Sequence, residues 1–217
     1  MKIAIALYPE FTALDCIGPY EVLSRIPGVD IEFLSAAGGP VRSDTGALTI
    51  LTERKLADVP NPDILLVPGG PGDETAAGDP RMLEWLRRAH DTSKWTTSVC
   101  TGSLVLGAAG LLEGLEATTH WASYDRLAAY GARPVARRVV RQGKIITAAG
   151  VSAGIDMGLE LLAEESGVDF AQGVQLAIEY DPQPPFDVGS PSKAPRHVLE
   201  MVRSVFETMR PKSSATA

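Results

Sequence analysis

The sequence has little of the material from which disulfide-rich and metal-binding proteins are built. Its 217 residues include two cysteines, Cys16 and Cys100, and three histidines. Two cysteines are too few for a disulfide framework, and the sequence favours a reducing, cytoplasmic compartment. The histidines His90, His120 and His197 do not follow metal-ligand spacing, so we expect no metal site.

Long apolar runs and an excess of positive charge are also missing. The best candidate for a membrane span, residues 103–112, is interrupted by glycine and far shorter than the roughly 18 apolar residues required. The apolar segment at residues 3–8 is too short for a signal peptide. With 27 acidic and 20 basic residues, the chain has a net charge of −7. We therefore expect neither nucleic acid nor a membrane as a partner.

What is present is the composition of a folded domain. Hydrophobic residues make up 45% of the chain and charged residues 22%, which excludes a disordered or fibrous protein. Short apolar runs alternate with amphipathic segments, without a repeat or a linker. This alternation predicts one α/β domain over residues 1–210 with a mostly parallel sheet. The small, polar residues 211–217 are predicted to be a disordered tail.

The apolar periodicity predicts the individual elements. Continuous apolar or β-branched runs predict strands at 2–8, 30–36, 64–67 and 95–99. Turn residues between paired segments predict hairpins over 41–52 and 139–148. Helical spacing predicts helices at 80–92, 103–109, 121–130, 153–166, 170–180 and 196–209. The pair Gly18-Pro19 is predicted to open a further helix, with proline in its first turn, and residues 181–195 to be irregular.

Cys100 stands where a predicted strand meets a predicted helix. The strand at 95–99 ends directly before it, and Thr101 and Gly102 lead into the helix at 103–109. This context is typical of a nucleophile elbow, a sharp turn that presents its side chain at the end of the sheet. We expect the helix N-terminus to lower the pKa of the thiol and to populate the thiolate near neutral pH. Backbone N–H groups after the turn are expected to face developing negative charge. The alternative is a buried structural cysteine.

Two further segments follow predicted strands and are expected at the same edge of the sheet. The loop at 68–72, Pro-Gly-Gly-Pro-Gly, includes Gly69 and Gly70, whose amides can approach a ligand closely. Beside an elbow this loop suits an oxyanion hole, and the alternative is an ordinary tight turn. Asp15 is either a helix cap or a proton donor and acceptor for Cys100. Its protonation state matters, because a neutral carboxyl stabilises a thiolate and a carboxylate opposes its formation.

His120 has the most informative position of the three histidines. It lies in an Ala-Thr-Thr-His-Trp segment, 20 residues after Cys100 and at the start of the helix predicted at 121–130. A Cys–His pair is a common route to a reactive thiol, and a structural histidine at a helix start is the alternative. His90 and His197 lie among polar helical positions and are expected at the surface.

Together these motifs resemble the ThiJ/PfpI superfamily, which is related to class I glutamine amidotransferases, from the first strand to about residue 186. Within it, the chain is most similar to the bacterial isocyanide hydratases. The matching segments lie at 14–19, 68–70, 97–112, 117–121, 153–156 and 175–186. The elbow and the histidine segment are also similar to sensor domains of AraC-type regulators. Those regulators carry a helix-turn-helix domain after the α/β domain, which we do not expect here.

The resemblance implies a flavodoxin-like three-layer α/β sandwich, with helices on both faces of the sheet, and a homodimer. It also implies that Cys100 is the nucleophile, that Asp15 is its acidic partner and that Thr101 lies beside the thiol. Peptidase-like relatives have histidine at the position of Thr101, so the resemblance argues against peptidase activity. Glyoxalase- and chaperone-like relatives usually carry glutamate where this chain has Asp15. No role is expected for Cys16.

The reaction that the resemblance implies is the addition of water to a small-molecule isocyanide, which gives an N-substituted formamide without a metal or an organic cofactor. We expect the Cys100 thiolate to attack the terminal carbon and form a thioimidate, with Asp15 as acid and then base. The amides of Gly70 and Thr101 are expected to stabilise developing charge. Three alternatives stay open: a redox or stress-response protein in which Cys100 is oxidised, a ligand-binding sensor domain, and a glyoxalase-like enzyme.

Overall fold

The computed structural model describes residues 1–209 of the chain. They form two compact units, one of Met1–Glu179 and one that begins at Tyr180. The single domain expected over residues 1–210 stays a prediction. The tail expected at 211–217 lies outside the described residues.

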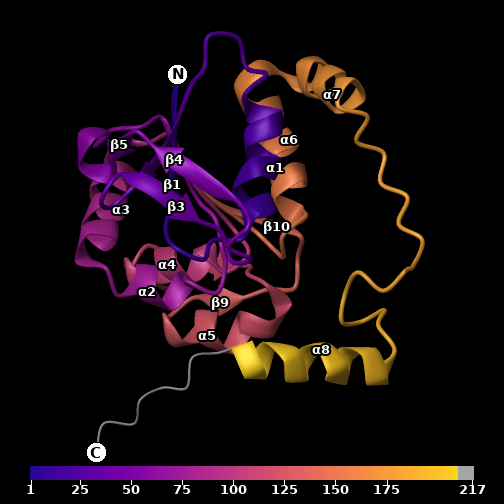
Figure 1. The fold of residues 1–217 in the computed structure, drawn as a ribbon. Helices are drawn as coiled ribbons and strands as arrows, with labels where there is room; N and C mark the ends of the chain where they lie inside the picture. Colours follow the sequence, from indigo (N-terminus) through magenta and orange to yellow (C-terminus); the bar gives the residue numbers. More distant parts are fainter. Residues whose placement is uncertain (210–217) are drawn as a thin grey trace, which may run out of the picture. The chain divides into compact units, whose positions relative to one another are not determined.

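A seven-stranded sheet lies at the centre of the first unit (Figure 1). Its strands, in spatial order, are β10 (Val139–Gln142), β11 (Ile145–Ala148), β7 (Trp95–Val99), β6 (Ile64–Val67), β1 (Lys2–Leu7), β2 (Asp30–Ser35) and β5 (Arg54–Lys55). Neighbouring strands pair in parallel, except for the antiparallel hairpin of β10 and β11. The predicted mostly parallel sheet and the hairpin over 139–148 are therefore confirmed.

Two small sheets accompany the central one. An antiparallel pair joins β3 (Gly39–Arg42) to β4 (Thr49–Thr52), which confirms the hairpin predicted over 41–52. A parallel pair joins β8 (Glu116–Ala117) to β9 (Arg133–Pro134), which the sequence did not reveal because each strand has two residues.

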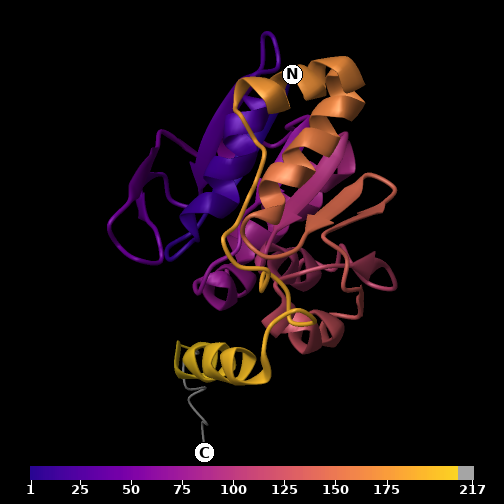
Figure 2. The ribbon, with the colours of Figure 1, turned by 90° about the vertical axis from the view of Figure 1, so that its right-hand side faces the viewer.

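Helices cover both faces of the central sheet, and this three-layer arrangement confirms the predicted fold class (Figures 1 and 2). One face carries α1 (Ala13–Leu23), α6 (Ala153–Ser166) and α7 (Val168–Ala177). The other carries α2 (Asp73–Ala77), α3 (Pro80–Thr92), α4 (Gly102–Ala108) and α5 (Tyr124–Ala129). Two short 3-10 helices, η1 (Leu56–Asp58) and η2 (Trp121–Ser123), complete the first unit.

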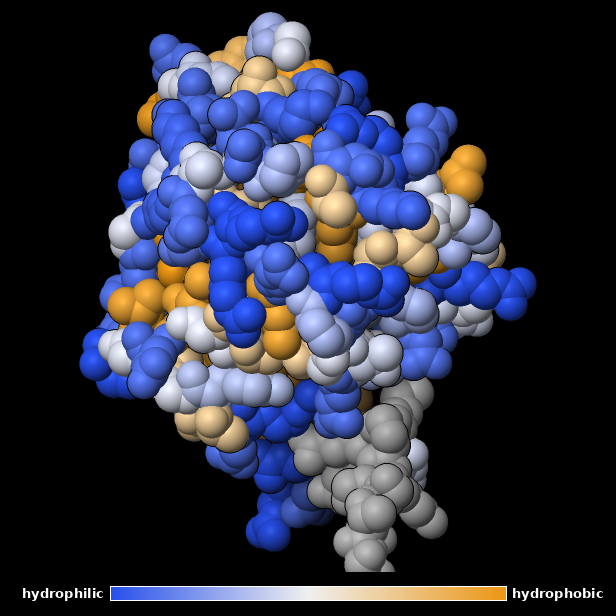
Figure 3. All heavy atoms as spheres, turned by 90° about the vertical axis from the view of Figure 1, so that its left-hand side faces the viewer, coloured by the Kyte–Doolittle hydropathy of each residue, from blue (hydrophilic) through white to orange (hydrophobic). Residues whose placement is uncertain are grey.

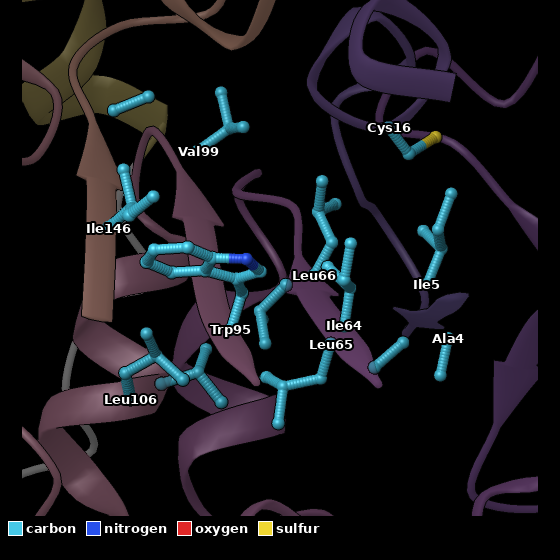
Figure 4. Close-up of a cluster of buried hydrophobic side chains, with 14 of the residues drawn as sticks. Ala4, Ile5, Cys16, Ile64, Leu65, Leu66, Trp95, Val99, Leu106 and Ile146 are labelled. Carbon is cyan, nitrogen blue, oxygen red and sulfur yellow. The ribbon is translucent and has the colours of Figure 1, made fainter. Parts of the chain in front are cut away.

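The core lies between the sheet and these helices. All four residues of β6 are buried, because this strand is covered on both faces and therefore contains no polar residue. The close-up in Figure 4 shows side chains of the core, including Trp95 of β7 and Leu106 of α4. On the face of the molecule drawn in Figure 3, hydrophilic residues predominate and hydrophobic ones form small groups.

Helix α1 corrects one prediction, because it begins at Ala13 rather than at Gly18. Proline inside a helix removes a backbone hydrogen bond, so Pro19 indicated a helix start. The helix nevertheless continues through Pro19, whose ring packs against α6 at Gly154. A methyl group on Gly154 would lie 3.1 Å from the Pro19 ring, so glycine allows this close contact.

Smaller corrections concern the following helices. The predicted helix at 121–130 is split into η2 and α5, and the one at 170–180 is observed at Val168–Ala177. Helix α6 has the predicted bounds, and the face that it buries against α1 contains Gly154 and Gly158. Helix α2 is a single short turn that periodicity does not reveal.

The second unit contains an irregular segment followed by α8 (Arg196–Met209), both as predicted. Several of its large apolar side chains are exposed, among them Phe186, Met201 and Val205. Within residues 1–209, no helix combines the length and the apolar character that crossing a membrane requires.

Candidate active site

The carboxyl ends of three neighbouring parallel strands meet at one edge of the sheet. Strand β7 ends before Cys100, β6 ends before the loop with Gly69, and β1 leads into α1 with Asp15. Strand β1 has β2 on one side and β6 on the other, so the order in which successive strands are added to the sheet reverses here. Such a reversal is where ligands bind in open α/β sheets. The structure thus brings together the residues that the sequence proposed from three separate segments.

Cys100 occupies a strained backbone turn, as expected of a nucleophile elbow. Its φ is +56°, a conformation that non-glycine residues seldom adopt and that often marks a functional site. The turn is held on both sides. The Cys100 N–H donates to the carbonyls of Ala148 and Ala149, and the Cys100 carbonyl accepts from the hydroxyl of Thr119 at 3.0 Å. The side chain is 6% exposed, so the sulfur is almost enclosed.

The absence of side chains at two positions allows the elbow to pack this closely. A Cβ on Gly69 would lie 2.4 Å from the Thr101 amide nitrogen, and a Cβ on Gly102 would lie 2.1 Å from the Val67 carbonyl oxygen. Real Cβ atoms do not approach backbone atoms so closely, and both positions therefore require glycine. The loop after β6 is consequently pressed against the turn that carries Cys100.

Asp15 is fully buried and lies beside the Cys100 thiol. Its Oδ2 accepts a 2.9 Å hydrogen bond from the Gly69 N–H. Its Oδ1 is buried and has no hydrogen-bond partner of good geometry among the described residues. Asp15 is the third residue of α1, whose N-cap is Thr12, so it does not precede the helix as predicted. The carboxyl bonds across to the next strand's loop, which argues against the capping alternative.

Burial sets the protonation of this pair. It raises the pKa of Asp15 to about 7, against the lowering effect of the Gly69 amide and the Cys100 thiol. Burial also raises the pKa of the Cys100 thiol well above its ordinary value, and the charge of Asp15 raises it further. The expectation of a lowered thiol pKa is therefore wrong in direction. Helix α4 has only seven residues, and its N-terminus does not outweigh burial.

Two backbone amides are directed at the sulfur of Cys100. The N–H groups of Val151 and Thr101 hydrogen bond to Cys100 and lower the pKa of its thiol. The Gly70 N–H, expected to face the substrate, instead donates to the Thr101 hydroxyl at 2.9 Å. The Gly69 N–H is engaged by Asp15. The amides directed at the sulfur are therefore those of Thr101 and Val151, and the two glycines hold the side chains around it.

Val151 is a contact that sequence analysis missed. It contributes a main-chain N–H, which carries no signature in residue type. The available signal is topological: β11 pairs with β7, with Ala148 opposite Val99, so the residues after Ala148 lie beside the elbow. The same juxtaposition lets Thr119 reach the Cys100 carbonyl.

His120 caps the short helix η2, where its ring accepts a hydrogen bond from the Ala122 N–H. This placement favours the structural alternative that the sequence left open. Its pKa is lowered by burial. His90 is half-buried and bonds to the Thr96 hydroxyl at 2.8 Å, so the prediction of a surface position is wrong for it. His197 is exposed, as expected.

Cys16 differs from Cys100 in its surroundings, although both are buried free thiols. It lies in the apolar core (Figure 4), and its Sγ donates to the Ala13 carbonyl. Burial raises the pKa of the Cys16 thiol to about 12, and we assign it no role in the chemistry. Among residues 1–209 no cluster of histidine, cysteine and carboxylate side chains is arranged to hold a metal ion.

Comparison with known proteins places this geometry in a family. The model of the DJ-1/PfpI family matches residues 1–164 of the chain. The protein belongs to the DJ-1/PfpI family. This confirms the resemblance to the ThiJ/PfpI superfamily that the sequence motifs indicated.

Individual family members are similar over different parts of the chain. An isonitrile hydratase of Pseudomonas putida is 46% identical over 203 residues, which cover 94% of this chain and 89% of that protein. The HTH-type transcriptional regulator CdhR of Pseudomonas aeruginosa is 34% identical over 69% of this chain, but over only 43% of its own length. The crystal structure of a ThiJ/PfpI family protein from Pseudomonas syringae superposes with a TM-score of 0.92 at 40% identity, covering 96% of this chain and 86% of that one.

Proposed function

We propose that this protein is an isocyanide hydratase, which adds water to R–N≡C and releases the formamide R–NH–CHO. The observation that carries the proposal is the buried pair of Cys100 and Asp15 at a strained elbow. A thiol and a carboxyl that share protons away from water are suited to nucleophilic attack coupled to proton transfer. The similarity to the isonitrile hydratase of Pseudomonas putida, over nearly the full length of both chains, supports the substrate class.

The first half of the reaction forms a covalent intermediate. At neutral pH about half of the molecules hold the thiol of Cys100 beside the carboxylate of Asp15, because the pKa of Asp15 is about 7 and that of the thiol is higher. As the S–C bond forms, the thiol proton moves to Asp15 Oδ1. Asp15 then delivers that proton to the former isocyanide carbon, which gives the thioimidate R–N=CH–S–Cys100. The N–H groups of Thr101 and Val151 stabilise negative charge on the sulfur during transfer.

The second half hydrolyses this intermediate. The Asp15 carboxylate takes a proton from water while the oxygen attacks the same carbon, and the proton passes to the substrate nitrogen. The C–S bond then breaks, a proton of the new hydroxyl returns through Asp15 to the Cys100 sulfur, and the formamide leaves. One carboxyl serves as base and as acid in alternation, so its pKa near neutrality suits both roles.

The test is formamide production from an aryl isocyanide, followed by mass spectrometry. Wild-type protein and Cys16→Ala should both form product, because the Cys16 thiol bonds to the Ala13 carbonyl and has no part in the proposed proton transfers. Cys100→Ala should form none while keeping the same circular dichroism spectrum. Rapid quench of the wild-type reaction should show one substrate mass added to the peptide that contains Cys100. Normal turnover by Cys100→Ala would refute the assignment of the nucleophile.

The proposal includes the assembly and the compartment. We infer a homodimer in a reducing cytoplasm, since two buried free thiols suit such a compartment and α7 exposes the apolar side chains of Val168 and Leu176. Light scattering at micromolar concentration should give twice the mass of the chain. A monomeric mass would contradict the assembly without affecting the chemistry proposed for Cys100.

A further inference from the structure

Tyr8 is a buried tyrosine directly after β1, and the proposed chemistry does not use its hydroxyl. Its side chain is 4% exposed, and its Oη donates a 2.7 Å hydrogen bond to the Pro68 carbonyl. Pro68 is joined by a single peptide bond to Gly69, whose N–H donates to Asp15 Oδ2 at 2.9 Å. One planar peptide group therefore accepts a hydrogen bond from Tyr8 and donates one to Asp15.

We propose that Tyr8 is a positioning residue that fixes Asp15 through the peptide bond between Pro68 and Gly69. Tyr8 does not reach the reacting atoms in this scheme. It holds the carbonyl side of the peptide, and the amide side of the same rigid plane is thereby held against Asp15. The importance of this role for turnover rests on the proposed function, whereas its effect on the carboxyl of Asp15 does not.

The two hydrogen bonds that the peptide between Pro68 and Gly69 makes, with Tyr8 and with Asp15, strengthen each other. A carbonyl that accepts a hydrogen bond makes the amide N–H of the same peptide a stronger donor, by about 10–30% in condensed-phase estimates. A stronger donor at Gly69 favours the charged form of Asp15 and lowers its pKa, in the direction already recorded for that amide. Removing the Tyr8 hydroxyl should therefore raise the pKa of Asp15.

The charged groups around Tyr8 and around Asp15, the two ends of this hydrogen-bond relay, are compatible with this role. Tyr8 stays neutral and able to donate, because burial and the charges of Asp73 and Asp15 raise its pKa well above the ordinary value. Arg126 acts in the opposite direction on Tyr8 and is itself paired with Asp73.

Asp15 has its own titratable neighbours. Its carboxyl faces the Cys100 thiol, and the charge of Asp44 from the loop between β3 and β4 raises its pKa. The thiol of Cys16, the next residue in α1, is sensitive to the charge of Asp15 and stays protonated. Substitution of Tyr8 leaves these groups in place, so a change in the pKa of Asp15 reports the relay through the peptide.

The experiment measures the carboxyl of Asp15 directly. Carbon-13 NMR of protein labelled at aspartate carboxyls, with the Asp15 signal assigned by its loss in Asp15→Asn, gives its pKa in wild type and in Tyr8→Phe. We expect the pKa of Asp15 to increase by about half a unit in Tyr8→Phe, because the charge-assisted hydrogen bond from Gly69 to Asp15 loses about a quarter of its strength. The acidic limb of the kcat/KM profile for isocyanide hydration should move by the same amount. Tyr20→Phe is the matched control, because the ring of Tyr20 packs against Phe33 and its substitution should move neither value.

A second variant protects the test against misfolding of Tyr8→Phe. Site-specific replacement of Tyr8 by 3-fluorotyrosine keeps the ring and makes the hydroxyl a stronger donor, so the pKa of Asp15 should fall. An unchanged pKa of Asp15 in both variants would overturn the proposal. A pKa that moves as expected in a protein that does not hydrate isocyanides would keep the positioning role and refute the proposed function. If the protein hydrates isocyanides but the pKa of Asp15 is the same in wild type and in both variants, the proposed function is kept and the positioning role of Tyr8 is refuted.

Discussion

Replacing Asp15 by asparagine should stabilise the protein while it removes the proposed acid and base. Asp15 is buried, and its pKa rises from 3.8 to about 7 on folding. A raised carboxyl pKa means that the folded protein binds this proton more tightly than the unfolded chain. The stability that proton binding by Asp15 contributes is therefore fully present below pH 3.8 and is lost as the pH rises through about 7. At about 1.4 kcal/mol per pKa unit, the ionised carboxyl costs about 4 kcal/mol at alkaline pH.

The useful quantity is the change of this cost with pH, because it does not depend on how well asparagine fits. Between about pH 5 and about pH 7.5, the wild type should lose about 2.5 kcal/mol of unfolding free energy through Asp15, and Asp15→Asn should lose none of it. Urea unfolding followed by circular dichroism, with a reducing agent present, gives both values. The advantage of Asp15→Asn should grow by that amount over this interval. An advantage that stays constant would show that the carboxyl of Asp15 is not perturbed by burial, and the proton transfers proposed here would lose their basis.

Four further predictions concern the same site. Asp15→Asn should lower kcat for isocyanide hydration by at least about 10²-fold, the scale of general acid–base catalysis, and near-normal turnover would contradict its role. The kcat/KM of the wild type should rise with pH up to about 7 and then level off, because the Asp15 carboxylate must accept the thiol proton; a profile flat through neutrality would exclude this. Cys100→Gly should be about 1 kcal/mol more stable than Cys100→Ala in thermal unfolding, because glycine adopts a φ of +56° without steric cost, and equal stabilities would show that the elbow is not strained. Gly102→Ala should be destabilised by at least about 1–3 kcal/mol in urea unfolding, since its methyl group meets the Val67 carbonyl; unchanged stability would show that the turn can move apart.

The sequence predicts the central strands and several helices well. Strands β6 and β7 have the expected bounds because their apolar or β-branched runs end at proline or at the elbow, and α3, α6 and α8 match residue for residue. The start of α1 was missed because Pro19 has the local signature of a first turn. Its tolerance inside the helix depends on Gly154, which is remote in sequence.

The candidate site likewise has parts that the sequence predicts and parts that it does not. Cys100, Asp15 and Gly69 could be brought together from the sequence, because each follows a strand whose carboxyl end reaches one edge of the sheet. The contribution of Val151 could not, because it is a main-chain N–H in a segment placed by β11. The direction in which the pKa of the Cys100 thiol shifts could not be predicted from the sequence either. A helix N-terminus can be predicted locally, whereas the burial that outweighs it arises only when segments remote in sequence pack around Cys100.

The main-chain contact of Val151 has a consequence for protein engineering. Because the donor is the peptide N–H, the side chain at this position can be exchanged without removing the hydrogen bond to Cys100, and only proline deletes it. A library for new substrates can therefore vary residue 151 without deleting this hydrogen bond. The neighbouring Gly69 and Gly102 offer no such freedom, since a side chain at either meets backbone atoms. The site thus combines positions that tolerate diversification with others that must stay fixed.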